Sequence, residues 1–328
     1  MIDLHLHLDG SLSVETALFL AKEQKIPLPT TDAVELKELL CAPKNCRDLN
    51  EYLTRFDLPL QVLQTKGAIC YAVYDLIKRL DSQGLWYAEL RFAPQLHQKQ
   101  GLTQFEVVQA ALYGMEQALH ETNIKVQFIL CCMRGNEKEA ENVQTVKVAR
   151  EFLNGGVAAI DLAGAEGIYR TATFEPVFTL AKKLEIPFTI HAGEADGAQS
   201  VKDAVRFGAK RIGHGLHARE DRELVKLLSE YEIAVELCPT SNLQTKAIQS
   251  LAEYPVRDYL CAGIVATINT DNMTVSDTDI YAEFALLKRE IQLSRNEEKQ
   301  LLMNSVRAAF TVNPEKERLY ELVEKKFK

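Results

Sequence analysis

The chain has 328 residues, of which 26% are charged and 47% hydrophobic, which is ordinary for a folded globular protein. Its 46 acidic and 38 basic side chains give a net charge of −8, which argues against a nucleic-acid partner because no basic stripe is available to replace phosphate counterions. No segment approaches the roughly 18 apolar residues needed to cross a bilayer, which argues against a membrane protein.

The cysteines indicate the compartment. There are seven, an odd number, two of them (Cys131 and Cys132) are adjacent, and no Cys-x-x-Cys spacing occurs. This is typical of reduced thiols in a cytoplasmic protein, not of a disulfide framework or a thiolate zinc site. A strand candidate begins at residue 2, which leaves no room for a signal peptide. We therefore expect a cytoplasmic protein.

Eight short, nearly continuous apolar runs alternate with helical patterns along the chain. Alternating strands and helices predict a parallel α/β architecture. No repeat, low-complexity segment or linker interrupts the pattern, so we predict one domain over residues 1–328, a length normal for an α/β barrel with insertions. The predicted strands are residues 2–8, 86–93, 125–132, 157–162, 186–191, 211–214, 233–238 and 264–270, and helical patterns cover 105–121, 140–153, 174–184, 198–207 and 220–230.

The interval between the first and second predicted strands is too long for one crossover. It contains an amphipathic run at residues 14–24 and a leucine-rich helical stretch from about 33 to 81, broken by prolines. The sequence predicts a helical insertion over about residues 13–81. Two interpretations are equally weighted: a lid over the barrel mouth, or an ordinary extra helical layer.

The first strand carries two histidines on one face. His5 and His7 are two residues apart, so their side chains point to the same side of a strand, while the intervening leucines occupy the other side and would pack against helices. Two imidazoles followed by Asp9 make half a site for a transition metal. For an isolated His-x-His, a buried strand that happens to carry two histidines is as good an explanation.

Three later strands decide between these explanations, because they also end in polar, metal-competent residues. His191 ends the fifth strand and Glu194 follows it, His214 ends the sixth, and Asp271 follows the eighth. Such residues at the carboxyl ends of strand after strand are the layout of a (β/α)8 barrel active site. In a closed barrel the first and eighth strands are neighbours and the fifth faces them across the mouth, whereas an open sheet would usually scatter these residues. We therefore predict a TIM barrel.

The strand-end residues predict metal-assisted hydrolysis. Zinc would lower the pKa of a bound water to about 7 and so provide a hydroxide nucleophile. Glu194 could meet a substrate without binding the metal, and His214 could orient the water or accept its proton. The predicted zinc ligands supply three nitrogens and one oxygen: His5, His7, His191 and Asp271.

The chain resembles the adenosine deaminases of the amidohydrolase superfamily over essentially its whole length. Eight strings, in order along the chain and on the predicted strand ends, carry the resemblance. They are HLHLDGSL at 5–12, YAELRFAP at 87–94, ILCCMRG at 129–135, AIDLAG at 159–164, HAGE at 191–194, RIGHGLH at 211–217, ELCPTSN at 236–242 and INTDN at 268–272.

The resemblance implies zinc-dependent hydrolysis of adenosine, and of 2′-deoxyadenosine, to inosine and ammonia in purine salvage. It implies that the four ligands hold one zinc per chain, with Asp271 also catalytic. Glu194 would be a protonated carboxyl that donates to purine N1, which needs an apolar pocket that raises its pKa. His214 would position the attacking hydroxide and stabilise the charge of the tetrahedral intermediate.

The resemblance also implies the substrate contacts. The Gly164 N–H would meet purine N3, and Asp9 would accept from the ribose 5′-hydroxyl. Leu53 and Phe56 would form an apolar wall above the nucleoside, and His7 would contact the substrate as well as the metal.

Two residues depart from the family pattern. Asn272 stands where many members have a second aspartate that faces purine N7, but an amide can donate to N7 without being protonated, so we expect function to be kept. Ala165 stands where an acidic residue is common, and nothing explains that change.

Several alternatives stay open within and beyond the family. Asp9 favours a nucleoside over free adenine, because sister enzymes for adenine tend to carry glutamate there. A modified adenosine, such as aminodeoxyfutalosine, would keep the purine-binding residues and differ only in the lid. A nucleotide would need a cationic clamp, and a binuclear site would need a lysine ending the fourth strand; neither is present. A non-catalytic purine-binding homologue is disfavoured, because every metal and proton-transfer position is filled.

Some other residues carry weaker expectations. Arg91 is expected to pair with a carboxylate under the barrel mouth, and no role follows for the segment at 238–242. His217 lies either near the site or on the surface, whereas His97 and His120 are expected to face solvent. The predicted partner is a small-molecule nucleoside, with no nucleic acid and no membrane, and no motif indicates an oligomeric state.

Overall fold

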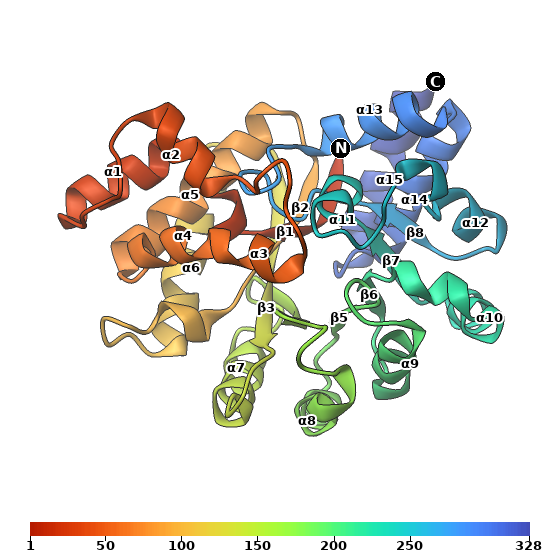
Figure 1. Cartoon of the computed structure of the whole chain (residues 1–328), viewed down its shortest axis with the longest axis horizontal. Coiled ribbons are helices and arrows are strands. Elements are labelled where there is room, and N and C mark those ends of the chain that lie inside the picture. Colours follow the sequence, from red (N-terminus) through yellow and green to blue (C-terminus); the bar gives the residue numbers. More distant parts are fainter.

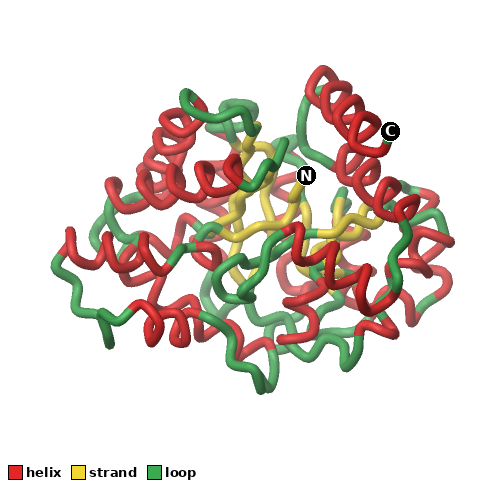
Figure 2. The backbone as a smooth tube through the Cα atoms, turned by 90° about the horizontal axis from the view of Figure 1, so that it is seen from above, coloured by secondary structure: helices red, strands yellow, loops and turns green.

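Parallel strands form the centre of the molecule and helices surround them (Figure 1), as the view from above also shows (Figure 2). The computed structural model describes residues 1–328. All eight predicted strands are present, with ends that differ from the predicted ones by a few residues. They are β1 (Ile2–His7), β2 (Tyr87–Phe92), β3 (Lys125–Met133), β4 (Val157–Ala163), β5 (Thr189–Ala192), β6 (Arg211–His214), β7 (Ala234–Leu237) and β8 (Ala266–Ile268).

The strands follow one another in chain order around a barrel. β1–β4 form one parallel sheet and β5–β8 another. At one seam Leu6 pairs with Asp271, and the Asp271 N–H donates to the His5 carbonyl at 2.8 Å. At the other seam Ile160 pairs with Phe188. Because bridges join the sheets at both seams, the prediction of a (β/α)8 barrel over an open sheet is confirmed.

Helices connect the strands and form the outer layer. Local signals set their ends: the Thr103 side chain accepts from the Glu106 N–H while Glu106 accepts from the Thr103 N–H, a capping box at the start of α6. No helix combines the length and the apolar character that a membrane crossing requires. After β2 the helices are α6 (Gln104–Leu119), α7 (Glu139–Glu151), α8 (Glu175–Lys183), α9 (Ala198–Phe207), α10 (Arg222–Glu230), α11 (Pro239–Gln244), α12 (Val256–Cys261), α13 (Ile280–Ile291), α14 (Arg295–Ala308) and α15 (Asn313–Phe327), with 3-10 turns η3 (Pro94–His97), η4 (Thr171–Phe174), η5 (Leu216–Glu220) and η6 (Leu251–Glu253).

The segment between β1 and β2, coloured from red to orange in Figure 1, has two parts. The long helix α5 packs against α6 and belongs to the outer layer. By contrast, α3, η2 and α4 supply side chains to the cavity at the barrel mouth. The insertion therefore contributes both to the outer helical layer and to the wall of the cavity. Its elements are η1 (Asp9–Ser11), α1 (Val14–Gln24), α2 (Ala33–Leu40), α3 (Leu49–Leu53), η2 (Thr54–Phe56), α4 (Asp57–Val62) and α5 (Lys66–Ser82).

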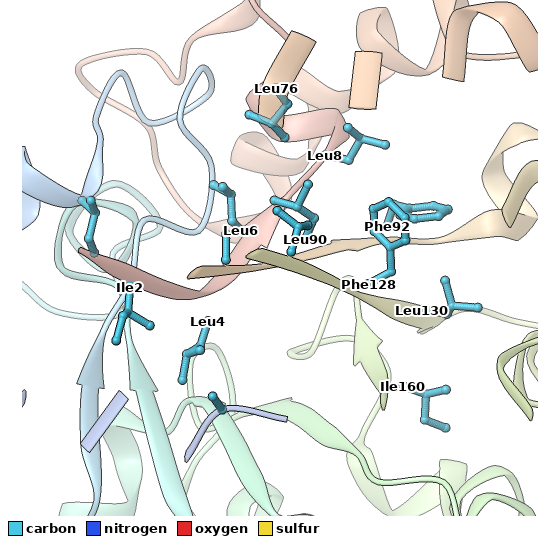
Figure 3. Close-up of a cluster of buried hydrophobic side chains, with 14 of the residues drawn as sticks. Ile2, Leu4, Leu6, Leu8, Leu76, Leu90, Phe92, Phe128, Leu130 and Ile160 are labelled. Carbon is cyan, nitrogen blue, oxygen red and sulfur yellow. The ribbon is translucent and has the colours of Figure 1, made fainter. Parts of the chain in front are cut away.

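The alternation along β1 fixes which way its histidines point. Leu4, Leu6 and Leu8 are buried in the main hydrophobic core together with Leu76 of α5 and Leu90 of β2 (Figure 3). Burying each leucine contributes about 1.5–3 kcal/mol. Because neighbouring side chains on a strand point to opposite faces, the packing of the leucines outside the barrel directs the histidines of β1 into it.

Candidate active site

The four predicted ligands meet at the carboxyl ends of β1, β5 and β8, and their ligand atoms all lie within 4.8 Å of one another. His7 Nε2 is 3.3 Å from His191 Nε2, and Asp271 Oδ1 is 3.4 Å from Nε2 of both His5 and His7. Two ligands of a tetrahedral ion with bonds of about 2.1 Å lie roughly 3.4 Å apart. The spacing of these side chains therefore fits a single metal ion.

The outer nitrogens of two imidazoles face carboxylates. His5 Nδ1 is 2.7 Å from Glu236 Oε2, and His191 Nδ1 is 2.8 Å from Asp161 Oδ2. A carboxylate at Nδ1 holds the ring proton there and leaves the Nε2 lone pair for the cluster. His5 Nε2 is buried and has no hydrogen-bond partner, as expected of a nitrogen whose partner is a metal. The orphaned nitrogen and the donor set both fit a metal centre.

Arg91 holds these two carboxylates from below. Its Nη1 is 3.0 Å from Asp161 Oδ2 and its Nη2 is 3.0 Å from Glu236 Oε2, and all three side chains are fully buried. Glu236 also accepts from Arg211 Nε at 2.6 Å. The expected pairing of Arg91 with a carboxylate under the barrel mouth is confirmed. Because the same carboxylates contact His5 and His191, the network fixes both rings.

Three strand ends adopt an uncommon backbone conformation at the cavity. His214, Asp271 and Gly164 have φ angles of 62°, 63° and 107°. For residues other than glycine, positive φ is uncommon and is often found at functional sites. At Gly164 the backbone itself favours glycine.

Glu194 is buried between two polar side chains. Its Oε1 accepts from Thr245 Oγ1 at 3.0 Å, and its Oε2 is 3.5 Å from His214 Nε2. Burial, followed by the negative charges of Asp271 and Glu166, raises the pKa of Glu194 to about 8. A carboxyl that is neutral at pH 7 can donate a proton, so Glu194 has the properties of a general acid.

His214 has a defined tautomer. Asn242 Oδ1 accepts from the Tyr254 hydroxyl at 2.9 Å, which turns its Nδ2 toward His214 Nδ1 at 3.0 Å. Asn242 therefore donates to Nδ1, and the ring proton lies on Nε2, the nitrogen that faces Glu194. Burial lowers the pKa of His214 well below its ordinary value, so the ring is neutral. The tautomer makes His214 a hydrogen-bond donor toward the cavity. The sequence alone had left open whether it orients water or accepts a proton.

A cavity of about 300 Å³ extends from this cluster toward the surface. Leu53 of α3 and Phe56 of η2 form part of its wall, with the Phe56 ring centroid 6.4 Å from that of His7. Burial raises the pKa of Asp9, which also lines the cavity, to about 6. Gly164 and Asn272, like Glu194, His214, His191 and Asp271, line the same cavity, and His5 lies beneath it in the metal cluster.

Asn272 is held by a residue that the sequence did not reveal. Its Nδ2 donates to the Tyr52 hydroxyl at 2.9 Å, and that hydroxyl lies 2.7 Å from Ser276 Oγ. One N–H of the amide is therefore used inside the protein, and the amide has a second. Tyr52 belongs to α3, so the insertion reaches the amide directly.

The three remaining histidines fall outside the cavity. The prediction that His97 faces solvent is wrong: the ring is buried, and its Nδ1 is 2.7 Å from the Leu63 carbonyl. The reason is that Leu63, which follows the last residue of α4, contacts the ring. This contact forms only when the insertion folds onto η3. His120 is exposed as expected, and His217 is partly exposed and paired with Glu220.

Two more residues were missed. Asn242 and Glu166 act on His214 and on the Glu194 loop, respectively, through contacts that have no local sequence signal. Asn242 did lie in the string ELCPTSN, which matched the family without a derivable role.

A closed parallel barrel with polar side chains gathered at the carboxyl ends of its strands is the architecture of (β/α)8 enzymes. In this chain, three histidines and one aspartate at the barrel mouth also form a candidate metal centre. The family model described as adenosine deaminase matches residues 1–326, and the chain belongs to the adenosine deaminase family.

Individual relatives agree with this assignment. The chain is 49% identical to an adenosine deaminase of Haemophilus ducreyi over 100% of this chain and 96% of the relative. It is 44% identical to an adenosine deaminase of Enterococcus faecalis, covering 99% and 96% of the two chains. Among solved structures, an adenine deaminase from Arthrobacter aurescens superposes with a TM-score of 0.89 at 25% identity, covering 99% and 98% of the two chains.

Proposed function

We propose that the protein hydrolyses adenosine, and 2′-deoxyadenosine, to inosine and ammonia, with one zinc ion per chain. The observation that carries the proposal is the position of Glu194, a buried carboxyl at one cavity wall beside a cluster of three histidines and an aspartate. The adenosine deaminases among its relatives support the same substrate.

The metal would be held by four side chains: His5, His7, His191 and Asp271. A zinc ion in such a set supplies activated water as a nucleophile at neutral pH. The carboxylates behind His5 and His191 orient the two rings toward it.

In this proposal two side chains transfer protons, and a third stabilises charge with a hydrogen bond. Glu194 gives its proton to purine N1, which makes C6 electrophilic, and the water oxygen forms a bond to C6. His214 donates its Nε2–H to that oxygen and so stabilises the developing charge. Asp271 takes a proton from the water, and this proton passes to the amino nitrogen. The C6–N bond then breaks and ammonia leaves, while the second proton of the water passes from the C6 hydroxyl to the Glu194 carboxylate. C6 is then a carbonyl, both carboxyls have regained their starting protonation states, and one water has been consumed per inosine formed.

The remaining cavity residues bind the nucleoside in this proposal. The Gly164 N–H donates to N3, Asn272 donates its second N–H to N7, and Asp9 accepts from the 5′-hydroxyl. Leu53 and Phe56 cover the base, and His7 borders it beside the metal.

The charges of the cavity favour a nucleoside over a nucleotide. Apart from histidine, Arg134 is the only basic residue that lines it. Its guanidinium donates to the carbonyls of Tyr169 and His191 and to Thr171 Oγ1, so it is not free for a phosphate. Asp9 would repel a 5′-phosphate and suits a sugar hydroxyl.

The direct test is product analysis with purified protein and adenosine. The proposal predicts one inosine and one ammonia per adenosine, loss of activity on chelation, and recovery when Zn²⁺ is added. No inosine from zinc-loaded protein would reject it.

A further inference from the structure

Glu166 lies three residues beyond the end of β4, is buried, and accepts five hydrogen bonds. Its Oε1 accepts from the Ser200 hydroxyl as well as from one backbone N–H. A carboxylate suits this position because it is an acceptor only, whereas a glutamine would turn an NH2 group against other donors. The backbone donors are four consecutive N–H groups, of Gly193 (2.6 Å), Glu194 (2.9 Å), Ala195 (2.7 Å) and Asp196 (3.2 Å).

Arg134 holds the same segment at its other end. Its Nη2 donates to the His191 carbonyl at 2.6 Å and to Thr171 Oγ1 at 2.9 Å. Thr171 Oγ1 lies 2.7 Å from Ser200 Oγ, which in turn donates to Glu166. Each hydroxyl accepts one hydrogen bond and donates one to the next group. The hydroxyls of Thr171 and Ser200 therefore connect the buried Arg134 guanidinium to the buried Glu166 carboxylate.

The segment between these two anchors is short and closely packed. At Gly193, where φ is +71°, an added Cβ would lie 2.6 Å from Val201 Cγ2. The same segment begins with His191 and carries Glu194, whose carboxyl must face the cavity. Its carbonyl at the start and its N–H groups at the end are both bound to charged side chains, which leaves the Glu194 backbone little freedom.

We propose that Glu166 is the positioning residue of Glu194: it holds the backbone N–H groups of residues 193–196 so that the Glu194 carboxyl points at the substrate. This inference rests on the proposed function for its catalytic consequence. Glu166 does not line the cavity, so it holds Glu194 through the loop and not by contact with the substrate. Its negative charge also favours the protonated form of Glu194.

The experiment compares Glu166→Gln, Glu166→Asp and the matched control Glu283→Gln. Glu283 is also a buried carboxyl that accepts from a backbone N–H, of Thr240, and from a hydroxyl, of Thr278, but it does not contact the 191–196 segment. Misplacing a catalytic group by about 1 Å can cost about 10²-fold in rate. We expect kcat on adenosine to fall about 10²-fold in Glu166→Gln while KM changes less than about 3-fold. Glu166→Asp, which keeps the charge, should recover part of kcat, and the control should keep it.

Hydrogen exchange of the peptide that spans residues 191–197 gives a readout independent of turnover. Exchange should accelerate in Glu166→Gln and stay unchanged in Glu283→Gln, at temperatures where both remain folded. If the unmutated protein does not deaminate adenosine, the proposed function fails, and the exchange result still decides whether Glu166 positions the loop.

The inference is overturned if Glu166→Gln keeps the kcat and the exchange rate of the unmutated protein, or if KM rises as much as kcat falls. Should Glu166→Gln fail to fold, Ser200→Ala removes one donor and breaks the connection to Arg134. It should lower kcat several-fold and accelerate exchange at 193–196, and unchanged values of both would overturn the inference.

Discussion

The amide nitrogen of Asn242 lies 3.0 Å from His214 Nδ1, and this contact sets which nitrogen of the ring carries the proton. Tyr254 fixes the amide by donating to Asn242 Oδ1 at 2.9 Å. The buried, neutral ring then presents Nε2–H to the cavity. In the proposed mechanism, this arrangement lets His214 stabilise charge on the attacking oxygen by donating a hydrogen bond.

Asn242→Asp should reverse the tautomer. A carboxylate beside Nδ1 accepts a hydrogen bond, so the ring proton moves to Nδ1 and Nε2 no longer donates. We expect kcat on adenosine to fall about 10²-fold or more, with a small change in KM, in steady-state kinetics. Tyr254→Phe, which leaves the amide donor in place, should lose less. A normal kcat in Asn242→Asp would show that the tautomer of His214 does not matter.

Glu194→Gln should keep the fold, the metal and the nucleoside but lose most turnover. The amide fills the same space between Thr245 and His214 and has no acidic proton for N1. General acid catalysis contributes about 10²–10⁴-fold, so kcat should fall by at least that order. Metal analysis and inosine binding by calorimetry provide the controls. Turnover like that of the unmutated protein would remove Glu194 from the mechanism.

Asp9→Ala should weaken the preference for a nucleoside. Loss of a charge-assisted hydrogen bond to the 5′-hydroxyl costs roughly 1–3 kcal/mol, or about 5- to 150-fold in kcat/KM on adenosine. Activity on 5′-deoxyadenosine, which lacks that hydroxyl, should hardly change. An equal loss on both substrates would mean that Asp9 does not bind the sugar.

His97 should make the stability of the protein depend on pH. Burial lowers its pKa from 6.5 to about 4. Between pH 6.5 and pH 4 the His97 ring is protonated in the unfolded chain but not in the folded chain. The free energy of unfolding is therefore highest above pH 6.5. As the pH falls toward 4, His97 lowers the free energy of unfolding by about 3 kcal/mol in total.

His97→Asn keeps a donor for the Leu63 carbonyl and cannot titrate. The difference in unfolding free energy between the unmutated protein and this variant should therefore fall by about 2 kcal/mol between pH 7.5 and pH 5, in urea denaturation. The same difference at both pH values would contradict the assignment of a buried, neutral His97.

The barrel and its cluster could be predicted because each strand carries its own evidence. The alternation of His5 and His7 with leucines defines a strand with one chemical face, and His191 and Asp271 end apolar runs of the right length. Since parallel strands of a barrel end at one rim, residues at those ends meet whatever the loops do.

The positioning residues could not be predicted in the same way. Glu166 looks like an ordinary loop carboxylate, and its role depends on four N–H groups that begin 27 residues later in the chain. Asn242 lies in α11 and contacts His214 at the end of β6, and Tyr254 reaches Asn242 from the residue after η6, so both contacts depend on how separate elements pack. The error at His97 has the same origin, because the contact that buries it comes from the insertion.

The central claim is that this cavity deaminates a nucleoside, and the relative kcat/KM values for adenosine, adenine and adenosine monophosphate test it most directly. The reaction is followed with zinc-loaded protein by the change in purine absorbance when the C6 amino group is replaced. The kcat/KM for adenosine should exceed that for adenine and for adenosine monophosphate by at least about 10²-fold. This is the discrimination expected when a buried carboxylate has no hydroxyl to bind or meets a phosphate of like charge. A higher value for adenine would contradict the account and make the protein an adenine deaminase, and a higher value for the monophosphate would contradict the assignment of Asp9 to a sugar hydroxyl.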